Sequence, residues 1–184
     1  MQLSSTKEGF GLVLIALHWV MAFMIIALFF LGKYMTGLLY TDPWYHSAPY
    51  IHKSAGLIVM ALLVIRTLWV IILQRPALLP MPGWERLLAQ IVQKSFYVLL
   101  FGITISGYLI PTADGGGVEV FGWFTVPAVF SGLEHQEDMA GDIHYLLTYL
   151  LMFFLLLHTM GALKHHFIDR DETLTRILGI KGKS

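Results

Sequence analysis

The stretch DIHYLLTYLLMFFLLLHTMGALKHH, residues 142–166, decides the fold of this chain. Its uncharged part, residues 143–163, is long enough to cross a bilayer, which takes about 20 apolar residues. It nevertheless contains His144 and His158, which lie on nearly the same helix face and about 21 Å apart along the axis. Ionisable side chains are costly in lipid and therefore point to function. Two imidazoles at two depths indicate two ligand sites, each completed by another helix.

The composition indicates an integral membrane protein. The 184 residues are 57% hydrophobic and only 13% charged, with a mean hydropathy of +0.69, whereas soluble domains have about 25% charged residues. The formal net charge of zero argues against a nucleic-acid partner. The absence of cysteine excludes disulfides, iron–sulfur clusters and thiolate zinc sites.

Four apolar segments predict an all-α bundle of four transmembrane helices that forms a single domain, residues 1–184. The expected spans are 10–32, 51–73, 87–110 and 143–163. Lysine and arginine counts place both termini in the cytoplasm, because basic residues favour that side. Lys33 and Lys53 alone fall on the other side. The basic residues on the side of the termini are Lys7, Arg66, Arg75, Arg86, Lys94, Lys164, Arg170, Arg176, Lys181 and Lys183.

Depth in the membrane pairs the histidines. With this orientation His18 and His158 lie toward the inside, whereas His52 and His144 lie near the outer surface. Each pair joins two different helices, as a haem iron with two axial imidazoles requires. A zinc or copper site is the alternative, but it usually gathers three or four ligands at one point. We therefore expect these four residues to be the axial ligands of two haem irons, in the pairs His18/His158 and His52/His144.

Small residues stand one helical turn from each of these histidines, where a flat macrocycle would need room beside the backbone. Small residues also pack transmembrane helices together without any cofactor, so both interpretations stay open. The residues are Ala22, Gly56, Gly141 and Gly161.

Further polar groups have two interpretations each. Arg66 follows His52 by fourteen residues on nearly the same face. It is expected either to pair with a propionate of the inner haem or to extend to the membrane surface. Lys53, beside His52, could attract a small anion or a propionate. Several residues of the outer loops could together bind a metal, but the simpler interpretation is that they are ordinary loop residues in contact with water. They are His46, His135, Glu134, Glu137 and Asp138.

Several motifs resemble those of bacterial cytochrome b561. They are LHWV (17–20), HKSAG (52–56), SGYLIPTADG (106–115), VFGWFTVPA (120–128), HYLLTYLLMFFLLLHTMGALKHHF (144–167) and FIDRDETLTRILG (167–179). The resemblance covers nearly the whole chain. It implies a bacterial inner-membrane protein with two haem b groups, stacked across the membrane and ligated by the same four histidines. In that family quinone is the membrane partner, and at least one member oxidises superoxide outside and reduces ubiquinone.

The end of the fourth span is the expected quinone site. His165 lies seven residues after His158 and about 10 Å nearer the cytoplasm, with Lys164 and His166 beside it. The resemblance also implies a quinone-binding histidine here. A histidine can donate to a quinone carbonyl and exchange protons near neutral pH. The alternative is that these cationic residues only stabilise the end of the helix.

These observations predict an electron carrier between a periplasmic one-electron partner, such as superoxide, and ubiquinone. Its activity would be that of a quinone oxidoreductase or a superoxide oxidase. Two alternatives are a haem-bearing membrane anchor of a larger dehydrogenase and a transporter or channel that uses histidines as a proton or metal path. The short polar tails favour the first interpretation, because they leave no room for a soluble catalytic domain.

Overall fold

A computed structural model describes residues 3, 5–6, 9–73 and 79–180 of the chain. The elements follow in the order α1 (Leu12–Met35), α2 (Ser47–Ile72), α3 (Gly83–Leu109), β1 (Val118–Val120), β2 (Phe124–Val126), α4 (Gln136–Lys164), a π-helical turn η1 (His165–Asp169) and α5 (Thr173–Ile177).

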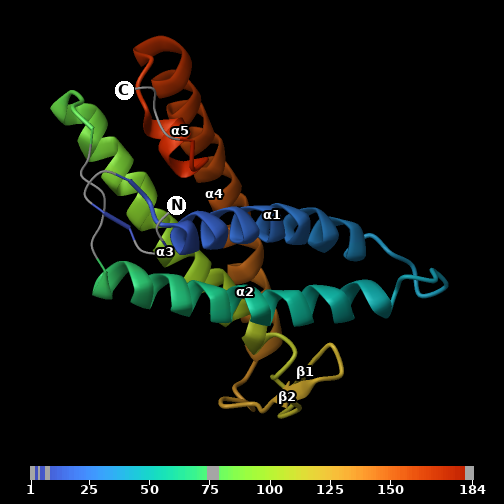
Figure 1. Cartoon of the computed structure of the whole chain (residues 1–184). Helices are drawn as coiled ribbons and strands as arrows, with labels where there is room; N and C mark the ends of the chain where they lie inside the picture. The colour runs from blue at the N-terminus through green and yellow to red at the C-terminus, as the bar shows by residue number, and fades with distance from the viewer. Residues whose placement is uncertain (1–2, 4, 7–8, 74–78, 181–184) are drawn as a thin grey trace.

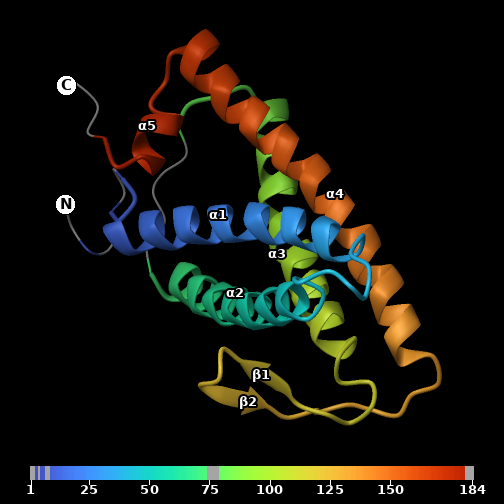
Figure 2. The same cartoon turned by 90° about the vertical axis from the view of Figure 1, so that its right-hand side faces the viewer.

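The four long helices form two antiparallel helical hairpins, α1/α2 and α3/α4, which cross steeply (Figures 1 and 2). The closest packing lies within each hairpin, and the two hairpins meet mainly where α2 lies against α3. Direct backbone contacts of α4 with α1 and α2 are sparse. Because of this crossing, the backbone of α4 is separated from α1 and α2, and side chains lie in the space between them.

The predicted bundle of four membrane-spanning helices is confirmed. All four helices are long and apolar enough to cross a bilayer. Each is longer than its predicted span, although α1 starts after the predicted start and α2 and α3 end just before the predicted ends. The start of α4, for example, includes the polar residues 136–142, seven positions before the predicted start. Hydropathy detects residues that prefer hydrocarbon, whereas the backbone continues its hydrogen bonds into the headgroup region; the sequence therefore understates the helix lengths.

A small apolar core fills the middle of the crossing, and lipid-facing side chains cover the rest. Many large apolar residues are exposed, such as Phe23 at 67%, Ile72 at 75% and Leu156 at 59%. In a membrane these side chains contact acyl chains rather than water. The core consists of Met21, Leu63, Leu99, Leu100 and Leu151.

The loop between α3 and α4 contains a short antiparallel hairpin, in which Val118 pairs with Val126 and Val120 with Phe124. Buried Ser54 fixes this hairpin to α2, because its hydroxyl donates to the Glu119 carbonyl and accepts from the Phe121 amide, both at 3.2 Å. The hairpin therefore lies beside His52, at the end of the bundle expected to be outside. Its three-residue strands are too short for a sequence pattern to reveal.

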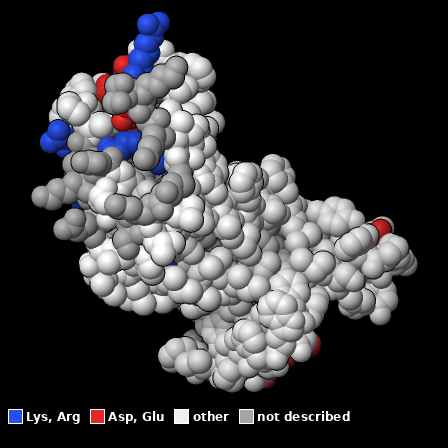
Figure 3. Space-filling view, in the orientation of Figure 1, with Lys and Arg blue, Asp and Glu red and all other residues white. Residues whose placement is uncertain are grey.

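The opposite end of the bundle carries the terminal segments and most of the visible cationic charge. The Trp19 indole donates to the Ile177 carbonyl at 3.0 Å, which ties the segment after α4 back to α1. Figure 3 shows Lys and Arg gathered at this end and none over the uncharged middle of this face. Lys7, Arg75, Lys181 and Lys183, which the orientation argument used, lie outside the described residues.

Candidate functional site

The histidine pair that is expected to lie toward the inside, called the inner pair, joins the two helical hairpins. His18 on α1 and His158 on α4 have ring centroids 6.3 Å apart, with an angle of 61° between their planes. The His158 ring also lies edge-on to Phe96 of α3, at 5.3 Å. The structure thus brings together two residues that are 140 positions apart in the sequence.

The pair that is expected to lie toward the outside, called the outer pair, has the same arrangement. His52 on α2 and His144 on α4 have ring centroids 6.2 Å apart, with an angle of 74° between their planes. The Nδ1 atom of His144 lies 2.9 Å from the Ile103 carbonyl, which can only accept a hydrogen bond. Nδ1 must therefore carry the proton, which leaves Nε2 free to bind a metal. The Nδ1 atom of His52 is buried without a hydrogen-bond partner among the described residues.

Two glycines hold the outer imidazoles at close range. A Cβ added to Gly107 of α3 would lie 2.9 Å from His144 Cε1 and 3.0 Å from its Nδ1. A Cβ added to Gly32 of α1 would lie 3.2 Å from His52 Cε1. The hydrogen atom of each glycine therefore lets a neighbouring backbone press against a ring and fix its orientation.

Both pairs fit the axial ligands of a haem. Two imidazoles on opposite sides of one metal ion have centroids about 6 Å apart, given a metal–nitrogen bond of about 2.0 Å and roughly 1 Å more to each ring centre. The observed separations of 6.3 and 6.2 Å agree with this value. A Cβ added to Gly56, Gly141 or Gly161 would meet nothing within 4 Å. Space beside the expected ligands and the sparse contacts of α4 with α1 and α2 leave room for a flat group.

Arg66 turns toward α1 near the inner pair. Its Nη1 donates to the carbonyl of Leu14, one turn before His18, at 3.3 Å. Arg66 thus reaches the backbone of α1 one helical turn from His18, and its pairing with a haem propionate stays a prediction.

A network of charged side chains surrounds His165, whose side chain is 13% exposed. Its Nδ1 lies 2.9 Å from Asp171 Oδ2 and 3.0 Å from Asp169 Oδ2, and its Nε2 lies 3.9 Å from Glu85 Oε2. Lys164 Nζ lies 2.7 Å from Glu85 Oε1 and 2.8 Å from Asp169 Oδ2. The ammonium of Lys164 is therefore engaged by carboxylates, whereas His165 keeps one ring nitrogen beyond hydrogen-bonding distance of them.

This network does not have the character of a metal site. Glu85, His165 and Asp169 are close enough together to share a cation, but the Lys164 ammonium already lies between the two carboxylates. In the outer loops His135 faces only exposed Glu134 and Asp138, at 3.5 and 4.0 Å. His46 instead stacks edge-on with Tyr40 and Tyr45.

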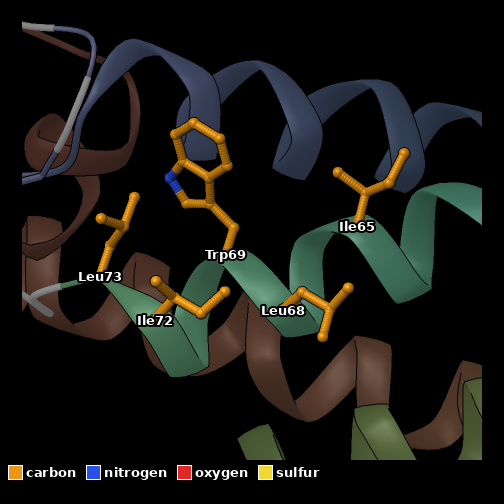
Figure 4. A pocket seen from close by; sticks show the side chains of 5 residues that line it. All are labelled: Ile65, Leu68, Trp69, Ile72 and Leu73. Carbon is orange, nitrogen blue, oxygen red and sulfur yellow. The ribbon is translucent and has the colours of Figure 1, made fainter.

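Two surface cavities have different chemistry. One of about 420 Å³ lies along the second half of α2, where Trp69 Nε1 is buried without a described partner (Figure 4). It is lined by Ile65, Leu68, Trp69, Ile72 and Leu73, which suit a lipid chain but offer no titratable group. The other, of about 360 Å³, lies at the outer end and is lined by Met35, Thr36, Tyr45, His46, Pro49, Tyr50 and Lys53.

The sequence did not reveal several residues that shape these sites. Glu85 and Asp171 approach His165 from different elements, and no spacing rule connects Glu85 with a residue 80 positions away. Gly107 lies in a quoted motif, but its contact with His144 depends on how α3 packs on α4. Only Asp171 had a local signal, because it lies six residues from His165 at the end of the helix.

The attachment of the segment after α4 to the rest of the fold should depend on pH, because the Asp171 carboxylate contributes to it. Burial raises the pKa of Asp171, but hydrogen bonds from Thr173 and the nearby His165 lower it more, to below the ordinary value of 3.8. A lowered pKa means that the ionised carboxylate stabilises the fold above about pH 4, and that this stabilisation is lost as the pH falls further. Asp171→Asn should therefore speed proteolysis of the C-terminal segment at pH 7, with the difference from the wild type shrinking below pH 4. An equal difference at both pH values, measured with an acid-active protease at the lower one, would contradict this.

Comparisons with known proteins agree with the geometry. The profile of the family described as prokaryotic cytochrome b561 matches residues 9–179. Cytochrome b561 homolog 2 of Escherichia coli (strain K12) is 45% identical over 182 residues, which cover 97% of this chain and 96% of that protein. The probable superoxide oxidase CybB of Yersinia pestis is 27% identical and covers 74% of this chain and 76% of its own length. Cytochrome b561 homolog 1 of Escherichia coli (strain K12) is 23% identical, with coverages of 89% and 93%. The chain therefore belongs to the prokaryotic cytochrome b561 family and is a multi-pass b-type cytochrome of the bacterial inner membrane that takes part in electron transfer.

Proposed function

We propose that the chain carries electrons across the membrane between a one-electron partner outside and a quinone at the inner end, and that this quinone is ubiquinone, as the family resemblance implies. The observation that carries this proposal is the pair of imidazole–imidazole contacts at two depths, each bridging the two helical hairpins. Both termini would then face the cytoplasm, and the hairpin β1/β2 would face the periplasm. The similarity to a probable superoxide oxidase supports superoxide as an outer substrate.

The four paired histidines would hold two haem b groups. When bound, each haem iron supplies one-electron chemistry by cycling between two oxidation states. His18 and His158 hold the inner position, and His52 and His144 the outer one. The Ile103 carbonyl and Gly107 fix the tautomer and the orientation of His144, as outer partners of metal-binding histidines usually do.

The outer cavity would admit the one-electron partner. Lys53 follows the outer ligand directly and lines this cavity together with Tyr50 and His46. An exposed ammonium there attracts a small anion such as superoxide. The cavity thus has a positively charged side chain in its lining, on the residue that follows His52.

The inner end would bind the quinone headgroup at His165. The free Nε2 of this residue can donate to a quinone carbonyl or accept from a quinol hydroxyl. Lys164 would act on the same site indirectly, because it holds Glu85 and Asp169 in place beside the imidazole. The quinone is thus proposed to meet a histidine seven residues from an inner haem ligand.

The haem content tests the central proposal. Purified protein should show a b-type, low-spin spectrum with two haems per chain, because each would have two imidazole ligands. His18→Ala should remove or alter the inner haem and leave the outer one, whereas His46→Ala should change neither. A single haem in the unaltered protein, or high-spin iron at both positions, would contradict the assignment.

Arg66→Gln tests the role of the arginine. A guanidinium near the inner haem favours the less positive, reduced state, so its removal should lower the midpoint potential of that haem alone. A change of about 1.4 kcal/mol corresponds to about 59 mV for one electron, and we expect a shift of some tens of millivolts. Potentiometric titration followed by absorption gives both values. Unchanged potentials would leave Arg66 with only its contact to Leu14.

His165→Ala tests the quinone site. The variant should bind both haems and react normally with small reductants at the outer end. Electron transfer between the haems and quinone should slow by about 100-fold, a typical effect of losing a positioned proton donor. Stopped-flow spectroscopy of the haem bands with decyl-ubiquinone measures this rate. A normal rate would exclude His165, and loss of a haem would mean that it is an axial ligand.

A further inference from the structure

The geometry around His165 assigns a definite role to each ring nitrogen. Nδ1 faces two carboxylate oxygens, on Asp171 at 2.9 Å and on Asp169 at 3.0 Å. Carboxylates accept hydrogen bonds when ionised, so Nδ1 carries a proton in this arrangement. Nε2 is then the nitrogen that can gain or lose a proton.

The backbone is shaped to bring Asp171 back onto His165. The α-helix changes to the π-helical turn η1 at His165, and π-helical turns often occur at functional sites. Arg170 then adopts a left-handed conformation with φ of 55°, unfavourable for a residue with a side chain. The amide of Asp171 donates to the His165 carbonyl at 3.1 Å, closing the turn. Asp171 is further fixed by the amide of Thr173, which donates to its other carboxylate oxygen at 2.7 Å.

Most of the charged groups that face His165 are carboxylates. Glu85 of α3, Asp169 of η1 and Asp171 contribute three negative charges, and Lys164 of α4 contributes one positive charge. Beyond them, Arg170 and His166 lie on the neighbouring chain, and α5, which packs against η1, has Glu172 as its N-cap and Arg176 in its last turn. A proton on Nε2 thus reduces the net negative charge of the nearest groups.

We propose that Asp171, assisted by Asp169, is the positioning residue that holds the proton of His165 on Nδ1 and so makes Nε2 the atom that exchanges protons with quinone. This inference rests on the proposed function, which places the quinone at His165, and adds the source of its protons. An Asp–His pair works in the same way in acyl-transfer triads, where the carboxylate fixes the tautomer and stabilises the imidazolium.

The reaction balances with the groups named. Reduction of one quinone to quinol consumes two electrons and two protons and forms two O–H bonds. The electrons arrive along the path of the proposed function. Each proton leaves Nε2 for a quinone oxygen, His165 becomes the neutral tautomer held by Asp171, and water at this end of the bundle reprotonates Nε2. Glu85 Oε2, 3.9 Å from Nε2, lies beside the atom that is refilled. Quinol oxidation runs through the same steps in reverse.

The test compares the pH profiles of Asp171→Asn and wild-type holoprotein in phosphatidylcholine nanodiscs. The haems are reduced with stoichiometric dithionite and mixed with decyl-ubiquinone from pH 5.5 to 8.5. Without the negative charge of Asp171 the imidazolium is harder to form, so the rate should decline at a lower pH. We expect the variant to be about tenfold slower than the wild type at pH 8 and within about twofold at pH 5.5, following general acid catalysis. Asp169→Asn/Asp171→Asn should enlarge the shift, and Asp171→Glu should restore much of the wild-type profile.

Three controls separate this role from a structural one. Asp138→Asn, which alters an exposed carboxylate near His135 at the other end, should leave the profile unchanged. Oxidation by ferricyanide, which takes up no proton, should be equally fast in all variants. Equilibrium binding of oxidised decyl-ubiquinone, followed by tryptophan fluorescence at pH 7, should stay within about threefold in Asp171→Asn, since the contact at Nε2 is retained.

The outcomes distinguish the two levels of the proposal. A wild-type pH profile in both Asp171→Asn and the double variant, with His165→Ala slow, would overturn the role of Asp171 and leave the quinone site intact. A normal rate in His165→Ala would overturn the quinone site and the relay together. Weaker quinone binding with an unshifted pH profile would show that Asp171 only shapes the site, and would overturn the relay.

Discussion

An imidazole inside a membrane needs a partner, and this requirement organises the whole molecule. α4 carries two histidines fourteen residues apart, so each needs a partner at its own depth. α1 and α2 run in opposite directions and supply one histidine each, near the start of each helix. The antiparallel hairpin therefore places one histidine at each depth. Direct backbone packing is correspondingly concentrated between α3 and α4, while α4 meets α1 and α2 through side chains, among them the two histidine pairs.

The two ends of the bundle have separate chemistry, with an apolar layer between them. Met21, Leu63 and Leu151 belong to the core cluster that lies between the inner and outer histidine pairs. The outer end combines Lys53 with tyrosines, whereas the inner end combines His165 with carboxylates and Lys164. The larger of the two cavities lies along α2 and is apolar, so its volume does not identify the reactive site.

Much of this architecture could be predicted from the sequence, because the strongest signals are local. Apolar length identified the four helices, and the fourteen-residue spacing on one helix identified His144 and His158 as a pair of sites. Depth alone then selected His18 and His52 as their partners, and the structure brings the same residues together. The surroundings of these residues could not be predicted in the same way. Glu85 reaches His165 only because α3 starts beside the end of α4, and Asp171 only because Arg170 turns the chain back. Such contacts depend on packing and on rare backbone conformations, which no periodicity encodes.

The division of each ligand pair between the two helical hairpins has a consequence for biogenesis. Each hairpin closes on itself and could enter the membrane as a unit before it meets the other. His18 and His52 belong to the first, and His144 and His158 to the second, so neither hairpin alone contains both members of a histidine pair. Insertion of the prosthetic groups would then join two preformed hairpins. Until that step, the hairpins would have to stay near each other with a gap between their histidines. A cell short of haem would accumulate loosely associated halves, which offer exposed polar rings to the proteases that survey the membrane.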